Sequence, residues 1–325
     1  MIDLIVVAYN NEKIILNNVI SIISNVKSDF RLIIINDCST DNTLSELKKI
    51  REFNNNNKMK KIEIINNRYP KFETKCENNG LKKAKSKYVI LLQADMFIQE
   101  FGFDQKLICA MEKYTDLLLI SGRGGENLLE LKEAFLASKG FQRLLNKNLL
   151  KHYYGRIFKS EKKSKQKLDK EVGIINLDIP KFLGSGSIGK IGENAQGKFS
   201  KQDLLDNKIY VCSSVIRGPL IIDLEKFKKI GFFDYRYFFQ GWDDHDACFR
   251  AFDQYRWRVG FVPVQYFSDI HPKEYTQFSL KRKSFINEMM ILINILKLSI
   301  FWKKSSLYKL FKEEIRLAEP EIRKF

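Results

Sequence analysis

The sequence lacks paired cysteines, a basic leader and a hydrophobic segment long enough to cross a membrane. Its five cysteines are odd in number, widely scattered and never form a CxxC pair. This pattern excludes a disulfide framework and a zinc knuckle, and it favours reduced thiols. The chain opens with MIDLIVVAYN, in which Asp3 stands where a signal peptide has basic residues. The longest apolar stretch, residues 289–302, is interrupted by Asn294 and Lys297. We therefore expect a cytoplasmic protein.

Acidic residues are scarce relative to basic ones. The chain has 56 Lys and Arg against 39 Asp and Glu in 325 residues, which gives a formal net charge of +17. A surplus of this size indicates an anionic partner, such as nucleic acid, an acidic lipid or a phosphorylated small molecule. Because no helix-turn-helix, zinc-finger or aromatic RNA-binding motif is present, we expect no nucleic acid among the partners. With 44% hydrophobic residues, the chain can build a large folded core.

The first hundred residues alternate between buried strands and amphipathic helices. Strands are predicted at the apolar runs IDLIVVAY, FRLIIIND, KIEIINN and YVILLQAD, and helices over residues 12–25, 43–53 and 76–84. This alternation predicts an α/β fold with a mostly parallel sheet and helices on both faces. Ligands of such sheets bind outside the carboxyl ends of the strands. At those ends the sequence places the polar pairs Tyr9–Asn10 and Asn36–Asp37 and the segment Gln93–Asp95.

Acidic residues also crowd into the segment WDDHD, which contains Asp243, Asp244 and Asp246. Three carboxylates within four residues repel one another unless a cation, basic groups or water offset them. Asp37 and Asp95 each follow a predicted parallel strand, so the sheet would bring them to one edge. Any single one of these residues could instead be a helix cap or a turn residue. As a set, they indicate a metal site or a general base.

Four segments resemble, in this order, motifs of the family 2 glycosyltransferases, which have the GT-A fold. They are VVAYNNE, IINDCSTDNT, NNGLKKAKSKYVILLQAD, and GPLIIDLEKFKKIGFFD followed by GWDDHDACFRA. The resemblance covers residues 2–100 and 215–272. It implies a Rossmann-like mixed, mostly parallel sheet. It also implies an inverting transfer of a sugar from a nucleoside diphosphate sugar, with a UDP-sugar as the first expectation, to a hydroxyl of a glycan or a lipid-linked acceptor.

The resemblance also implies roles for individual residues. The nucleotide would contact the strand ends at Ala8, Tyr9, Asn10, Asp37, Arg68 and Gln93. Asp95 would bind Mn²⁺ or Mg²⁺ on the diphosphate, with His271 as a further ligand. Asp244 would be the general base that takes the proton from the acceptor hydroxyl. The sugar and acceptor would lie against Gly218, Trp242 and Asp243, although Trp242 is equally compatible with core packing.

Three positions depart from the family pattern. Gln93 replaces the first Asp of the family's D-x-D, and a Gln side chain supplies no charge to a metal. Glu77 replaces an Arg, so a phosphate or base contact is missing unless a nearby basic residue such as Arg68 compensates. Val7–Ala8 replace a Pro–Thr pair. These departures bear on the donor and the metal more than on the fold.

The resemblance divides the chain into three parts. Residues 1–100 would form the nucleotide-sugar-binding half of a GT-A core, 101–275 the acceptor-binding half, and 276–325 a helical C-terminal extension. The Lys- and Gly-rich insertion at 155–208 is interpreted as a solvated loop, with an acceptor-binding lid as the sharper alternative. The amphipathic tail is expected to pack onto the core, with peripheral membrane contact as the other interpretation.

Three other functions stay open. A metal-dependent nucleotidyltransferase also uses an α/β sheet, a metal and carboxylates. A Gly-rich basic loop directly after the first strand would favour this function, but this sequence has AYNNE there, which does not. A nucleic-acid-binding basic protein is suggested only by the net charge. Gln93 and Glu77 keep open an inactive glycosyltransferase-like scaffold, although the intact WDDHD argues against it.

Overall fold

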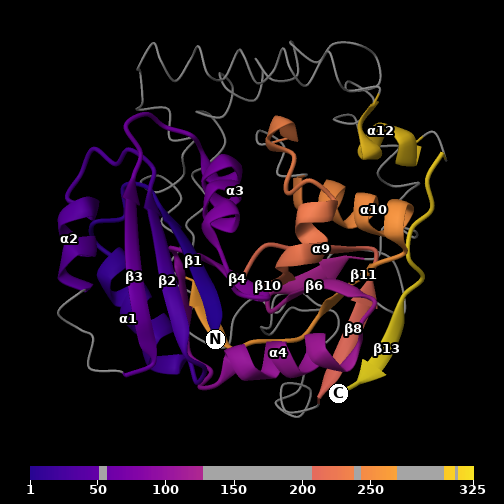
Figure 1. The fold of residues 1–325 in the computed structure, drawn as a ribbon, viewed down its shortest axis with the longest axis horizontal. Helices are drawn as coiled ribbons and strands as arrows, with labels where there is room; N and C mark the ends of the chain where they lie inside the picture. Colours follow the sequence, from indigo (N-terminus) through magenta and orange to yellow (C-terminus); the bar gives the residue numbers. More distant parts are fainter. Residues whose placement is uncertain (51–56, 127–206, 238–242, 269–303, 312–313) are drawn as a thin grey trace, which may run out of the picture.

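The computed structural model describes residues 1–50, 57–126, 207–237, 243–268, 304–311 and 314–325 (Figure 1). At its centre is a nine-stranded sheet in the order β13-β8-β11-β6-β10-β4-β1-β2-β3. Figure 1 shows the helices α3, α9 and α10 over one face of this sheet and α4 beneath the other. The α/β class expected from the sequence is confirmed, with parallel N-terminal strands in a mixed sheet.

The N-terminal half of the sheet is parallel. Its strands are β1 (Ile2–Ala8), β2 (Phe30–Asn36), β3 (Met59–Asn66) and β4 (Tyr88–Gln93). They are connected by α1 (Ile15–Asn25), α2 (Thr43–Lys49) and α3 (Glu73–Lys83). β1 lies between β2 and β4, and β2 pairs with β3. The carboxyl ends of all four strands therefore meet at one edge, which we call the carboxyl edge.

The second half mixes strand directions. Its sheet strands are β6 (Leu117–Ser121), β8 (Lys208–Cys212), β10 (Leu220–Asp223), β11 (Arg258–Phe261) and β13 (Glu321–Lys324). β10 is inserted antiparallel between β4 and β6, and β11 runs parallel to β6. Two small sheets pair β5 (Met96–Ile98) with β12 (Tyr266–Ser268) and β7 (Gly124–Glu126) with β9 (Ser214–Ile216). The helical elements are α4 (Phe103–Lys113), α9 (Leu224–Lys229), η3 (Tyr235–Tyr237), α10 (Asp243–Tyr255) and α12 (Ser306–Phe311).

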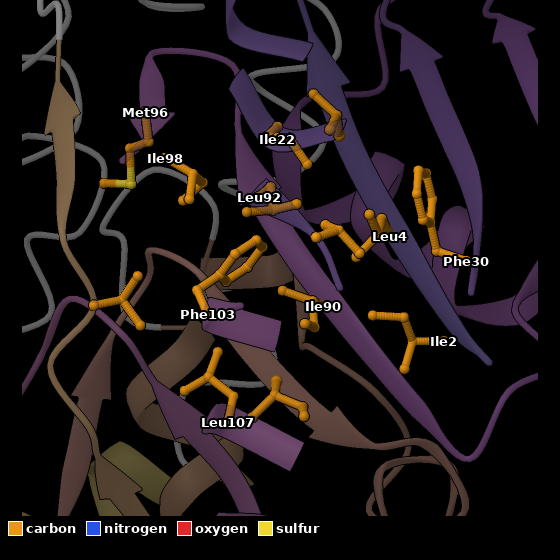
Figure 2. Close-up of a cluster of buried hydrophobic side chains, with 14 of the residues drawn as sticks. Ile2, Leu4, Ile22, Phe30, Ile90, Leu92, Met96, Ile98, Phe103 and Leu107 are labelled. Carbon is orange, nitrogen blue, oxygen red and sulfur yellow. The ribbon is translucent and has the colours of Figure 1, made fainter. Parts of the chain in front are cut away.

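Alternate residues of each strand belong to two hydrophobic clusters, one on each face of the sheet. In β1, Leu4 belongs to the cluster with α1 and α4, part of which is shown in Figure 2, whereas Ile5 belongs to the cluster with α3, α9 and α10. A Cβ atom at Gly80 of α3 would lie 2.8 Å from Cγ2 of Ile5. Glycine at this position therefore allows α3 to pack closely on β1.

The C-terminal extension differs from the helical expectation at its last residues. α12 is a helix, but β13 is an edge strand that pairs antiparallel with β8. Arg323 of β13 forms a two-bond ion pair with Asp116. A four-residue strand with one apolar and three charged residues has no apolar run, so hydrophobic periodicity could not identify it.

Several expectations fall on residues that the structure does not describe. The amphipathic part of the tail lies at 269–303, and nearly all of the Lys- and Gly-rich insertion lies within 127–206. Within the part of the chain that the structure describes, no helix is both long and apolar enough to span a bilayer.

Candidate functional site

The carboxyl edge brings the predicted nucleotide-binding residues together. The Asp37 amide donates to the carbonyl of Ala8 over 2.8 Å, and the Asn67 amide donates to the carbonyl of Asn36 over 2.9 Å. Gln93 of β4 is in register with Val7 of β1, on the side of β1 opposite to β2. The segments that follow β1, β2, β3 and β4 are thus neighbours, as the sequence predicted.

The loops after β1 and β2 are joined by hydrogen bonds around Asn10. The Asn10 amide donates to Oγ of Ser39 over 3.0 Å, and its Oδ1 accepts from the Thr40 amide over 2.8 Å. Asn10 has a φ of 51° and Cys38 a φ of 58°, both in the left-handed region. Non-glycine residues in this region carry strain that the surrounding structure must hold in place. Tyr9, beside Asn10, is buried.

Asp37 acts as a clamp on the loop between β3 and α3. Its Oδ1 accepts from Nδ2 of Asn67 at 3.0 Å and from the Lys71 amide at 2.7 Å, while its Oδ2 accepts from the Phe72 amide at 2.8 Å. Phe72 is held at a φ of 67°. Arg68 lies in the same loop, with its guanidinium 5.5 Å from the ring centre of Tyr69. Asp37 thus shapes the loop that carries Arg68, and its contact with a base stays a prediction.

The predicted metal ligands are only partly described. Asp95 lies half-buried in the turn between β4 and β5, two residues after Gln93. Gln93 itself donates from Nε2 to Oε1 of Glu73 over 3.3 Å. Among the described residues, no group of three or more His, Cys, Asp or Glu side chains is placed to hold a metal ion. His271 and Trp242 lie outside the described residues.

The start of α10 forms a buried charged cluster with α3. Arg217, in the segment between β9 and β10, forms an ion pair with Asp243 and lies 3.1 Å from Oε2 of Glu77. Its distance to Oε2 of Glu73 is 3.7 Å. Thr74 donates from its hydroxyl to Oδ2 of Asp243 over 2.6 Å. Side chains from α3 and α10 are therefore joined through one arginine.

The carboxyl groups of this cluster titrate differently from free ones. Burial raises the pKa of Glu77 well above its ordinary value, and Arg217 offsets only part of that rise. Burial likewise raises the pKa of Asp243, against the opposing effect of Arg217. Burial would also raise the pKa of Asp244, but His245 and Arg217 outweigh it and the net shift is downward. Asp244 is therefore ionised at neutral pH.

Asp244 and Asp246 have different surroundings. Oδ1 of Asp244 accepts from the His245 amide at 2.8 Å and contacts Nδ1 of its ring at 2.7 Å. Oδ2 of Asp244 accepts no hydrogen bond from any residue that the structure describes. Asp246 instead accepts from Nε of Arg250 and from the Ser306 hydroxyl, so it attaches α10 to α12. Of the two, only Asp244 has a carboxylate oxygen that accepts no hydrogen bond from the described residues.

Gly218 packs closely against Arg123. The sequence suggested that glycine here allows a ligand to approach the backbone. In the structure, a Cβ atom at Gly218 would collide with Cβ of Arg123. The packing of Arg123 therefore already accounts for a glycine at this position.

Sequence reasoning missed Arg217, Glu73 and Thr74. Arg217 precedes β10 in no recognisable motif, and its partners lie more than 130 positions earlier or about 25 later in the chain. The departure at Glu77 was the available signal, because a carboxylate in place of an arginine requires a new cation nearby.

Comparisons with known proteins bear on the family and the fold of this chain. Residues 3–160 match the family described as Glycosyl transferase family 2. No curated protein matches the chain. The structure of GalNAc-T7 with UDP, GalNAc and Mn²⁺ has a TM-score of 0.50 at 14% identity, covering 81% of this chain and 42% of that one. At this identity the likeness shows the fold alone, and that fold is of the GT-A type.

Two further structures are less similar. The mannosyltransferase PcManGT from Pyrobaculum calidifontis, solved with GDP-Man and Mn²⁺, has a TM-score of 0.47 at 11% identity, covering 81% of this chain and 54% of that one. S. aureus TarS has a TM-score of 0.45 at 15% identity, covering 84% of this chain. The chain spans only 37% of TarS.

Proposed function

Because residues 3–160 match glycosyl transferase family 2, we propose that the protein transfers a sugar, with inversion, from a nucleoside diphosphate sugar to a hydroxyl group. The acceptor would be a glycan or a lipid-linked glycan. One observation carries the proposal. Asp244 is a buried, ionised carboxylate with one oxygen held by His245 and the other without a hydrogen bond from the described residues.

The donor would bind at the carboxyl edge. Tyr9 and Asn10 follow β1, Asp37 follows β2, and Arg68 lies in the loop that Asp37 clamps. Gln93, at the end of β4, can donate to or accept from a ribose hydroxyl. GalNAc-T7 was solved with UDP, so a UDP-sugar is the first donor to test.

A divalent cation fits the turn at Asp95. Mg²⁺ and Mn²⁺ are commonly held by one or two carboxylates together with substrate phosphates, so a single carboxylate at this edge suffices. Asp95 would be that ligand, and His271 a second one. When bound, the cation supplies positive charge to the leaving diphosphate.

Asp244 would act as the general base. Direct displacement at the anomeric carbon inverts configuration and needs a group that takes the proton from the attacking hydroxyl. Oδ2 of Asp244 would take that proton, while His245 holds Oδ1 and fixes the orientation of the carboxylate. Asp243, tied to Arg217 and Thr74, would border the acceptor side.

Substitution of Asp244 tests this assignment. We expect Asp244→Asn to lower kcat by roughly 10²- to 10⁴-fold, the usual contribution of general-base catalysis. Donor affinity should change by less than about threefold, because the amide keeps the shape of the carboxylate. The measurements are transfer kinetics, with NMR of the product to read the anomeric configuration, and calorimetric titration of the nucleotide with Mn²⁺.

Asp246→Asn is the matched control on the same helix. It should weaken the contacts of α10 with Arg250 and Ser306 and so lower thermal stability, while the folded protein keeps its kcat. Full activity of Asp244→Asn would place the base elsewhere. If the wild-type protein bound no nucleotide and turned over no donor, the proposed function itself would be wrong.

A further inference from the structure

The charged cluster between α3 and α10 holds more carboxylates than cations. Glu73, Glu77 and Asp243 all lie within ion-pair distance of the single guanidinium of Arg217. Asp244 follows directly in sequence, and its pKa is also affected by Arg217. Glu77 and Asp243 are almost completely buried. An arginine shared in this way leaves an excess of negative charge at the point where the proposed base is located.

Arg217 also has a fixed orientation. Its guanidinium carbon lies 4.7 Å from the ring centre of Phe233, and its side chain is only 11% exposed. The strand that follows it, β10, pairs antiparallel with β4. A planar guanidinium with a stacking partner is pre-organised, so it can hold several carboxylates in one arrangement.

The cluster connects the two halves of the proposed site. Gln93, at the end of β4, donates to Glu73, and Glu73 faces Arg217. Arg217 in turn pairs with Asp243, which precedes Asp244. A continuous polar path therefore runs from the donor edge to the base, and Arg217 is its one cation among the residues described here.

We infer that Arg217 is a positioning residue for the transfer reaction, which holds the start of α10 against α3 and keeps Asp244 placed and ionised. This inference rests on the proposed function, because it assigns a role relative to the proposed base. Arg217 would act through Asp243 and Asp244 rather than by touching the donor.

The groups that set the ionisation of this pair come from several elements. They are Glu73 and Glu77 from α3, Arg217 from the segment before β10, and His245 and Cys248 from α10. Arg258 of β11 is paired with Glu321 instead, and the described contact from α12 is the Ser306 hydroxyl on Asp246. Of these groups, Arg217 is the one that is always positively charged. Its removal should therefore change the pKa of Asp244 in one direction only, upward.

The experiment compares the pH dependence of kcat/KM in wild type, Arg217→Met and Arg217→Lys. Methionine removes the positive charge, so the pKa of Asp244 should rise and the acidic limb of the profile should move to higher pH. Donor affinity, measured by titration calorimetry with UDP and Mn²⁺, should stay within about threefold of wild type. Lysine keeps the positive charge but lacks the planar guanidinium with its several donors, so it should give an intermediate profile.

Arg250→Met is the matched control. Arg250 is an α10 arginine bound to Asp246 and to the carbonyls of Ile230 and Phe232, away from Asp244. Its loss should lower the melting temperature and leave the pH profile unmoved. If Arg217→Met does the same, or if it abolishes donor binding with an unmoved limb, the inference is wrong. A wild-type protein without turnover would instead defeat the proposed function, and the inference with it.

Discussion

Two buried clusters lie at opposite ends of the parallel strands, one with a single carboxylate and one arginine, the other with several carboxylates and one arginine, and the carboxyl pKa is shifted in opposite directions in the two. At the start of β1, Asp3 accepts from Nε of Arg31 at 2.7 Å and from the amides of Lys85 and Ser86 at 2.6 and 2.8 Å. Burial alone would raise the pKa of Asp3, but these donors outweigh it and the pKa is lowered. At the carboxyl edge, the pKa values of Glu77 and Asp243 are raised.

The number of donors per carboxylate explains the difference. One carboxylate at the start of β1 has an arginine and two amides to itself. At the carboxyl edge, three carboxylates share one arginine. A buried carboxylate with enough donors stabilises the fold, whereas carboxylates that compete for a cation store unfavourable charge. The second arrangement is the one found beside the proposed base, where perturbed pKa values are often functional.

Arg31→Met should have the largest effect on stability. It would leave Asp3 buried beside an apolar side chain, and breaking a buried pair from one side costs about 3–5 kcal/mol. Because the folded pKa of Asp3 lies below its ordinary 3.8, the pair stabilises fully above pH 3.8 and less as pH falls through the folded value. Urea unfolding at pH 7 and pH 3 measures the loss of stability and its dependence on pH. A loss of equal size at the two pH values would contradict this explanation.

Asp37→Ala should have a smaller effect, about 1–3 kcal/mol, the cost of leaving buried donors unsatisfied. Here the donors are the Lys71 and Phe72 amides and the Asn67 side chain, so the damage should concentrate in the loop before α3. Hydrogen exchange of those two amides should rise more than that of β1. Uniform exchange across both segments would show that Asp37 does not act as a local clamp.

Glu77→Gln should have the smallest effect and the opposite sign. Because the folded pKa of Glu77 is raised above its ordinary 4.5, the group contributes stability below pH 4.5 that is lost as pH rises. A neutral glutamine has no proton to lose, so the free energy of unfolding of the variant should increase relative to that of wild type as pH rises. Unfolding curves from pH 5 to pH 8 test this. A constant difference would argue that Arg217 fully compensates Glu77.

Much of the N-terminal half could be predicted from the sequence, because its elements are determined by patterns within short segments. β1, β2 and β4 are nearly continuous apolar runs, because both faces of the sheet are covered. The polar residues that follow them are where ligands of such sheets bind. Family motifs in these segments predicted the glycosyltransferase family, and the match over residues 3–160 confirms it.

The rest depended on contacts between distant segments. Nothing local to Arg217 indicates that it pairs with Glu77 and Asp243, since only the sheet brings these residues together. β13 was missed because its charged residues pair with β8 and Asp116 rather than entering a core. The pattern of a segment predicts which element it forms, but it does not predict which side chain will neutralise another across the fold.

The antiparallel insertion of β10 has a consequence for folding order. During synthesis, β1 to β4 emerge first, and β4 then presents an unpaired edge until β10, over 120 residues later, is made. Pairing over such a separation raises contact order and slows folding, and exposed strand edges are prone to aggregation. The segment just before this late strand carries Arg217, which pairs with Asp243. The proposed active centre therefore matures only when that edge closes, so an incompletely synthesised chain would be inactive.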